Sequence, residues 1–317
     1  MNDSLIELRS PALAVRIDPL RGAEIASVEY LPGQFSLLAR TPWADHADLV
    51  RPARITHPAY ASADSWMEAY SGGWQVLFPH AGAPEEVQGV VRHYHGEASS
   101  IEWSVISAAA STTTLTATLA TVPARITRAI EVRNNTLEVV DVIENLADTD
   151  LEYDYVHHPA FGEEFLGAGG RISTSATRFV SDPEAPLPEF DQGSRHPWPH
   201  AQDRSGGEVD LSLVPTGEDR PLRFGYLTDF DGEQRVSFTS ARHGVTATLR
   251  WSDPEMSHAW FWQQVRSHPG YPWFGRGYVV AVEPATTVTS GPERARHRLG
   301  AHATREFRMT LILGEHQ

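Results

Sequence analysis

Short segments of alternating apolar and polar residues, separated by turns, recur along almost the whole chain. They are rich in β-branched and aromatic residues, as strands with one buried face are. Amphipathic helices are scarce: Leu5–Arg9 is too short and Asp45–Val50 makes at most a turn or two. The pattern predicts an all-β protein built from large packed antiparallel sheets. The clearest strand candidates are Leu13–Asp18, Ile25–Tyr30, Ile101–Ala108, Thr112–Ala120, Arg125–Val132, Leu137–Asn145, Leu151–His157, Arg235–Ser240, Val245–Trp251, Tyr278–Glu283 and Glu306–Leu313.

Turn residues indicate how the strands are organised. Most of the 22 Pro and 24 Gly lie between the strand candidates, as tight connections require. The longest irregular stretch is Ser181–Gly207. Because the strand patterns on its two sides are alike, we interpret it as a loop over one rim of a sandwich, not as a domain linker. We therefore expect a single domain over residues 1–317, although a chain of this length can hold two.

Composition removes several kinds of chemistry. The chain has no cysteine, which excludes thiolate nucleophiles, disulfides and Cys-bound metals. All 26 basic residues are arginine, so Schiff bases, PLP attachment and a P-loop lysine are excluded as well. The net charge of −15 argues against nucleic acids and anionic membranes as partners.

Two further observations concern location. No apolar run approaches the roughly 18 residues that span a bilayer. The start of the chain, Met1-Asn2-Asp3-Ser4, lacks the basic region and apolar stretch of a signal peptide. We therefore expect a cytoplasmic protein with no membrane partner.

Two adjacent histidines end one predicted strand. Side chains alternate along a strand, so His157 shares a face with Tyr155, whereas His158 shares the other face with Glu152 and Asp154. Only one of the two imidazoles can then face a polar cleft. His158 is the better candidate, because ionisable residues share its face. The alternative is an ordinary histidine at a strand end.

A carboxylate ends the apolar strand Tyr278–Glu283. Val279 and Ala281 share its face and are small, which leaves room for a ligand. Burial of this kind can raise the pKa of a Glu towards the range useful for proton transfer. The alternative is a strand-end Glu in solvent.

Two histidine pairs have spacings that suggest a metal, but their surroundings do not fit. His93 and His95 would share one strand face, yet Glu97 follows too soon for a cupin-type site. His196 and His200 have the spacing of a helical pair, but prolines between them exclude a helix interior. We therefore expect no bound metal.

Aromatic residues gather at three places, Trp74–Phe78, Trp260–Trp262 and Tyr271–Phe274. Trp260 and Trp262 fall on one face of a strand. Flat aromatic side chains suit the C–H faces of sugars, although such residues more often belong to the core.

In this combination, the chain resembles the aldose 1-epimerase (galactose mutarotase-like) superfamily over nearly its whole length. The three functional elements occur in the family's order, separated by 63 and 125 residues. The Asn-Arg pair of typical mutarotases is missing, and Trp260-Phe261-Trp262 stands where polar side chains are common, so the chain resembles a divergent branch. The matching elements are Gly22-Ala23-Glu24-Ile25-Ala26-Ser27, Gly72-Gly73-Trp74-Gln75, Phe78-Pro79-His80-Ala81-Gly82, His95-Gly96-Glu97, His158-Pro159-Ala160-Phe161 and Glu283-Pro284.

The resemblance implies a β-supersandwich with a concave face that binds a small carbohydrate, and an isomerase that needs no cofactor. Glu283 would be the general base on the anomeric hydroxyl and His158 the general acid to the ring oxygen. His95 would hydrogen-bond and polarise the opening sugar. We expect the substrate-binding residues to be Trp74, His80, Arg92, Trp260 and Trp262.

Three alternatives stay open at this point. A hexose-phosphate epimerase of the same superfamily would need arginines in the cleft, for which Arg54, Arg92 and Arg276 are candidates. A carbohydrate-binding protein could keep the cleft without turnover. A metal-dependent β-barrel enzyme is the third. The sequence indicates neither the sugar nor the oligomeric state.

Overall fold

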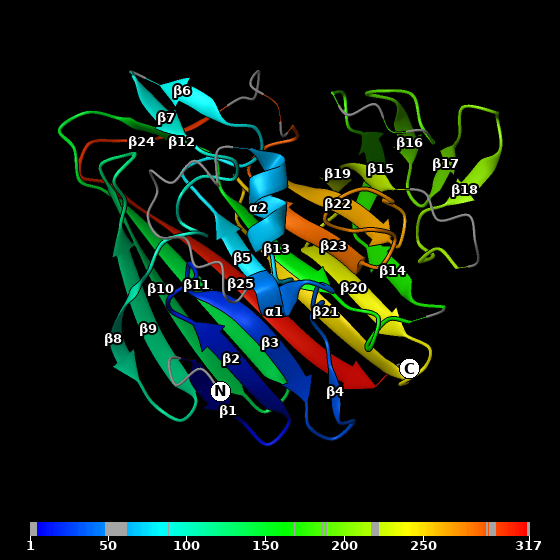
Figure 1. Cartoon of the computed structure of the whole chain (residues 1–317), viewed down its shortest axis with the longest axis horizontal. Helices are drawn as coiled ribbons and strands as arrows, with labels where there is room; N and C mark the ends of the chain where they lie inside the picture. The colour runs from blue at the N-terminus through cyan, green and yellow to red at the C-terminus, as the bar shows by residue number, and fades with distance from the viewer. Residues whose placement is uncertain are drawn as a thin grey trace.

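Two large antiparallel sheets lie face to face in the computed structural model of the protein (Figure 1). The structure describes residues 5–47, 62–87, 89–167, 169–184, 187, 189–216, 222–289, 291 and 296–315. Within them, the predicted all-β antiparallel sandwich is confirmed. The Arg54 candidate lies outside the described residues.

The larger sheet has eleven strands and carries the candidate site. One of them, β4 (Phe35–Ser36), pairs with β3 and lies outside the main strand order. The other strands follow in the order β1 (Ile6–Arg9), β2 (Leu13–Asp18), β3 (Glu24–Tyr30), β5 (Trp74–Leu77), β13 (Val156–Phe161), β23 (Tyr278–Ala285), β22 (His258–Val265), β19 (Arg223–Phe230), β15 (Ala176–Ser181) and β16 (Arg195–Pro197).

The second sheet has eight strands and closes the other side of the core. Alternate residues of its long strands are buried, as the sequence pattern predicts for strands with one face in the core. Its order is β14 (Arg171–Thr174), β20 (Gln234–Ser240), β21 (Val245–Trp251), β25 (Thr304–Glu315), β11 (Thr136–Asn145), β10 (Ala124–Arg133), β9 (Thr112–Thr118) and β8 (Ser104–Ala108).

Smaller elements decorate the sandwich. Figure 1 shows the helix α2 (Ala63–Ala69) lying across the outer face of the larger sheet, in front of β5 and β13. No helix in the described part of the chain is long and apolar enough to cross a membrane. The other small elements are α1 (Ala44–Ala47) and the strand pairs β6 (Glu85–Val87) with β7 (Val90–Arg92), β12 (Leu151–Tyr153) with β24 (His297–Leu299), and β17 (His200–Gln202) with β18 (Glu208–Asp210).

Most of the predicted strands are present, and two match to the residue, β2 and β21. Two predictions need correction. The segment Leu151–His157 is not one strand, because β12 pairs with β24 whereas β13 joins the larger sheet. Between them, the Asp154 amide donates to Pro79 and the Tyr155 amide to the Thr286 hydroxyl. The segment Ser181–Gly207, predicted as a loop, contains the strands β16 and β17. Strand β16 pairs with β15, and β17 pairs with β18.

The hydrophobic core fills the space between the two sheets. One buried cluster contains residues of both. The Phe161 ring stacks on Phe238 at 4.0 Å, and the Tyr155 ring stacks on Phe307 at 4.2 Å. These contacts fix which face of β13 turns inward. The single domain over residues 1–317 stays a prediction.

Candidate active site

Neighbouring strands of the larger sheet hold a row of three functional side chains on the face that turns away from the second sheet. The pairs Val156↔Ala285 and Ala160↔Ala281 set a register that puts His158 opposite Glu283. Trp260 pairs with Glu283 from the other side. His158, Glu283 and Trp260 all line a cavity of about 270 Å3.

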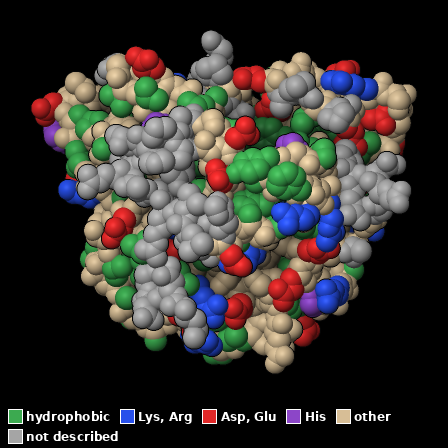
Figure 2. All heavy atoms as spheres, viewed as in Figure 1, with side chains coloured by type: hydrophobic (Ala, Val, Ile, Leu, Met, Phe, Trp, Pro, Cys, Tyr) green, Lys and Arg blue, Asp and Glu red, His purple; other side chains and the backbone are tan. Residues whose placement is uncertain are grey.

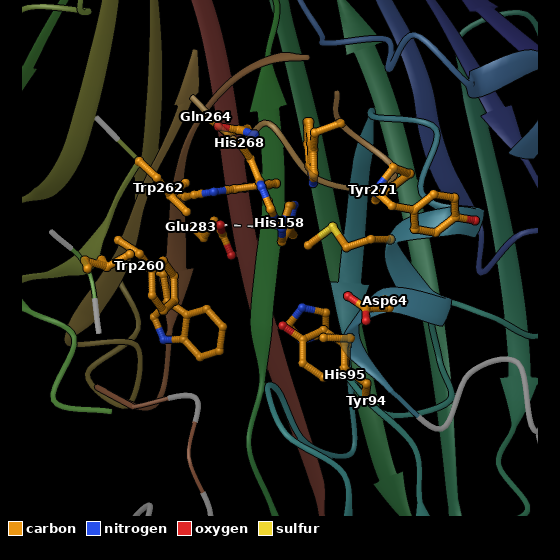
Figure 3. Close-up of a pocket in the computed structure, with 17 residues that line it drawn as sticks. Asp64, Tyr94, His95, His158, Trp260, Trp262, Gln264, His268, Tyr271 and Glu283 are labelled. Atoms are coloured by element: carbon orange, nitrogen blue, oxygen red, sulfur yellow. Dashed lines mark ion pairs between the residues drawn. The ribbon is translucent and has the colours of Figure 1, made fainter. Parts of the chain in front are cut away.

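His158 and Glu283 form a buried pair at the centre of this cavity (Figure 3). The distance from His158 Nε2 to Glu283 Oε1 is 3.5 Å, and the two residues are 3% and 1% exposed. Burial raises the pKa of the Glu283 carboxyl well above its ordinary value and lowers that of the His158 imidazole to about 4. Burial thus disfavours the charged form of both groups.

The carboxyl group has one oxygen left for a ligand. Glu283 Oε2 is buried and has no hydrogen-bond partner within the described residues. Leaving such an atom unpaired costs about 1–3 kcal/mol. A hydroxyl group bound in the cavity would satisfy it.

His95 faces the same cavity in a defined tautomer. The Gly82 amide donates to His95 Nδ1 at 2.9 Å, and the His95 amide donates to the Gly82 carbonyl at 3.0 Å. Because Nδ1 accepts, the neutral ring carries its proton on Nε2 and can donate it to a ligand. The backbone of His95 is left-handed (φ 64°), and a Cβ on Gly96 would lie 2.5 Å from the Phe78 carbonyl oxygen. The His-Gly element is thus a geometric requirement of this turn.

The helix α2 places one aromatic ring, that of Trp66, close to both histidines. The Ser62 hydroxyl caps the helix by accepting from the Ser65 amide at 3.3 Å. The helix buries Trp66, whose ring lies 4.6 Å from His95 and 5.9 Å from His158. The histidine rings themselves are 6.2 Å apart. The ring of His95 also lies 6.2 Å from that of Trp260, and Figure 3 shows both residues below the His158–Glu283 pair.

Several lining residues were not predicted. Gln264 follows Trp260 and Trp262 on the same face of β22, so strand alternation could have identified it. Its Nε2 is buried without a hydrogen-bond partner among the described residues. Figure 2 shows hydrophobic side chains gathered near the centre of one face. Tyr271, in the loop of residues 266–277, is exposed and lines the cavity. The remaining unpredicted lining residues are Ala63, Asp64, Met67, Tyr94, Leu187, Leu222, Phe224, His268, Tyr271, Pro272 and Trp273.

Of the eight predicted site residues, five line the cavity: Glu283, His158, His95, Trp260 and Trp262. The small neighbours of Glu283 do not create the room that the sequence suggested. Val279 and Ala281 are covered and belong to the same buried cluster as Trp262.

Three predicted binding residues lie elsewhere, and each has a structural explanation. Trp74 pairs with Pro159 on the core side of the sheet and donates from Nε1 to His157 Nδ1 at 3.0 Å. Arg92 donates to Glu85 at 3.0 Å and lines a surface groove beside the β6–β7 hairpin. His80 is fully buried next to Glu85, with 3.9 Å between Nδ1 and the carboxylate.

The charged groups of the described lining are acidic or titratable, since no arginine is among them. Asp64 contributes a carboxylate. Arg276 lies over the Phe274 ring instead, 5.9 Å from its centre. In the described part of the chain, no three His, Asp or Glu side chains converge as metal ligands.

His157, on the opposite face of β13, belongs to a buried polar network. Its Nε2 is 2.9 Å from the Tyr155 hydroxyl, which donates to Asp141. Asp141 accepts two hydrogen bonds from Arg128, at 2.8 and 2.7 Å. Burial alone would raise the pKa of Asp141, but the Arg128 guanidinium holds it below its ordinary value. With Trp74 on Nδ1, both ring nitrogens of His157 are occupied.

Comparisons with known proteins identify the family and the fold of the chain. The family model described as "Domain of unknown function (DUF4432)" matches residues 3–312. No curated protein sequence matches the chain.

Three solved structures illustrate the structural likeness. The Slr1438 protein from Synechocystis has 16% identity and a TM-score of 0.69, covering 98% of this chain and 96% of its own. The galactose mutarotase related enzyme from Lactobacillus acidophilus has 15% identity and a TM-score of 0.68, with 99% and 98% covered. The GalM/aldose epimerase homologue from C. elegans has 14% identity and a TM-score of 0.63, with 99% of both chains covered. The predicted galactose mutarotase-like fold is thereby confirmed, and the family match agrees with a divergent branch.

Proposed function

The chain belongs to the DUF4432 family, and from that premise we propose that it is an aldose 1-epimerase-like isomerase that interconverts the anomers of a monosaccharide. One observation carries the proposal. His158 and Glu283 form a buried pair that lines a small cavity, and Glu283 Oε2 has no hydrogen-bond partner among the described residues. A cavity of about 270 Å3 suits one sugar ring, being at the lower end of typical ligand sites.

Ring opening requires two proton transfers. A base removes the proton of the anomeric hydroxyl, an acid protonates the ring oxygen, and the bond between the anomeric carbon and the ring oxygen breaks to give the aldehyde. Rotation about the next carbon–carbon bond and the reverse transfers close the ring as the other anomer. No electron or group carrier takes part, so we propose an enzyme without a cofactor.

We assign Glu283 as the base on the anomeric hydroxyl and His158 as the acid to the ring oxygen. Burial disfavours the charged form of each group, since it raises the pKa of Glu283 and lowers that of His158, and so favours a neutral pair. A sugar hydroxyl that donates to Glu283 Oε2 stabilises the carboxylate, and the proton then passes to His158. His95 Nε2 donates a hydrogen bond to the sugar oxygen that gains charge.

An uncharged sugar fits this cavity better than a sugar phosphate. A phosphate is normally bound by arginines, and the described lining contains none, whereas it contains Asp64. We therefore favour a neutral monosaccharide over the phosphorylated alternative. We also propose a cytoplasmic location and a single domain.

Anomer exchange measured by NMR or polarimetry tests the proposal. The wild type should accelerate exchange for at least one sugar in a panel that includes sugar phosphates. Glu283→Gln and His158→Asn should each lower kcat/KM about 10²- to 10⁴-fold, the usual contribution of a general acid or base. If no sugar in the panel is accelerated, the carbohydrate-binding alternative replaces the enzyme. Unchanged rates in both variants would refute the residue assignment.

A further inference from the structure

The β19 side of the cavity is built differently from the rest of its lining. Phe224, on β19, pairs with Trp262, and its ring lies 5.7 Å from that of Trp260. Leu222 and Leu187 line the cavity beside it. We call Leu187, Leu222 and Phe224 the apolar wall.

The polar atoms closest to the apolar wall are already used within the protein. The Tyr226 hydroxyl, two residues along the same strand face, donates to Asp182. Trp260 Nε1 donates to the Thr287 carbonyl at 2.8 Å. Both of these polar atoms are therefore already hydrogen-bonded within the protein.

Other parts of the cavity offer polar atoms that are not used in this way. Gln264 Nε2 and Glu283 Oε2 are both buried, and neither has a hydrogen-bond partner among the described residues. Hydroxyl groups can thus be recognised by Gln264 and Glu283, whereas the side chains of the apolar wall carry no polar atom.

We propose that the substrate is a deoxy sugar, whose deoxygenated carbon faces the apolar wall of Leu187, Leu222 and Phe224. The inference rests on the proposed function of the same cavity. A hydroxyl placed against the wall gives up its hydrogen bonds to water without replacement. A methyl or methylene group at that position gains from burial. Discrimination between the two is expected to be about 10- to 100-fold in kcat/KM.

Matched sugar pairs test this preference on the wild-type protein. Anomer-exchange rates are measured for 2-deoxy- and 6-deoxyhexoses and for their fully hydroxylated parents. At least one deoxy sugar should exceed its parent at least tenfold. If a parent hexose is accelerated as well as or better than every deoxy analogue, the inference is wrong while the epimerase proposal stands. If no sugar is accelerated, both fail, and a preference for sugar phosphates also overturns both.

Two variants connect the preference to the wall. Leu222→Asn and Phe224→Tyr each introduce a polar group there, and each should lower the deoxy-to-parent ratio of kcat/KM at least fivefold. Leu213→Asn is the matched control, because Leu213 is 37% exposed and does not line the cavity. It should leave the ratio unchanged. An unaltered ratio in both wall variants, with folding intact by circular dichroism, contradicts the inference.

Discussion

The two faces of β13 place adjacent histidines in opposite surroundings. His157, on the core face, has both ring nitrogens bonded, to Trp74 and to Tyr155. His158, on the cavity face, lies 3.5 Å from Glu283, and both His158 Nδ1 and Glu283 Oε2 lack a hydrogen-bond partner among the described residues. Both imidazoles are fully buried or nearly so, at 0% and 3% exposure.

The difference shows what distinguishes a structural polar cluster from a candidate site. Burial and lowered pKa values are common to both histidines. Only the cavity face leaves hydrogen-bonding capacity unused, which a ligand can satisfy. Unused capacity, rather than a shifted pKa, is therefore the feature that marks the site.

The largest expected effect separates the two histidines by activity. His158→Gln should lower kcat/KM for anomer exchange about 10²- to 10⁴-fold, because it removes an acid–base group. His157→Gln should lower it less than tenfold, since a Gln amide can accept from Trp74 and donate to Tyr155. The measurement is NMR exchange on the best substrate of the panel. Equal losses in both variants would remove the distinction between the faces.

The next effect concerns the core network. Asp141→Asn leaves the buried Arg128 guanidinium without its counter-charge, and should reduce the free energy of unfolding by about 3–5 kcal/mol in urea titrations. Glu144→Gln, on the same strand β11, is the control. Glu144 forms an ion pair with Arg125, whose side chain is 46% exposed. That exposed pair should contribute less than about 1 kcal/mol. Similar losses in both variants would mean that the network does not carry stability.

Acid should destabilise the core face through His157. Burial lowers the pKa of this imidazole from 6.5 to about 3. Between these values the unfolded chain binds a proton that the folded chain does not, so stability falls as pH falls through the window, by up to about 1.4 kcal/mol per pH unit. His157→Gln should flatten the decrease in melting temperature between pH 6.5 and 4. An equally steep decrease would show that other groups control it.

Glu283→Gln should stabilise the protein although it lowers kcat/KM for anomer exchange. Burial raises the pKa of Glu283, so the folded chain retains a proton that the unfolded chain releases above pH 4.5, and stability is lost as pH rises. Replacing the carboxyl group with an amide removes this penalty. The gain at pH 7 should be about 0.5–2 kcal/mol, as is usual for replacements at functional sites. A loss of stability instead would mean that the carboxyl group is satisfied in the folded state.

The smallest expected effect is at Gln264. Gln264→Leu removes a donor that has no partner in the described structure, so KM should rise about tenfold, the worth of one hydrogen bond. The melting temperature should change little. A fall in kcat with unchanged KM would instead give Gln264 a role in the chemical step.

Local alternation was enough to choose His158 over His157, but the reason drawn from the sequence was incomplete. Glu152 lies on the separate strand β12, where Arg298 pairs with it at 2.9 Å, so it does not accompany His158. The ionisable neighbour of His158 is Glu283 on another strand, and His157 also has one, Asp141. A strand break that depends on distant partners cannot be read from a local pattern.

Trp74 is a second residue whose orientation the local sequence did not predict. Its motif resembles that of the family, yet the Trp74↔Pro159 pairing turns the indole into the core. The helix α2 and the loop of residues 266–277, which enclose the cavity, have no strong local pattern. Their positions depend on packing, as in the contact of the Trp273 ring with Trp262 at 5.7 Å.

Sequence by itself determined the strand alternation, the absence of thiol and lysine chemistry, and the order of His95, His158 and Glu283 along the chain. These properties depend on neighbouring residues and on composition. Only the tertiary structure decided that His158 lies opposite Glu283, and that an apolar wall stands on one side of the pair. The first follows from the pairing of β13 with β23 and the second from the pairing of β19 with β22, and no local pattern encodes either pairing.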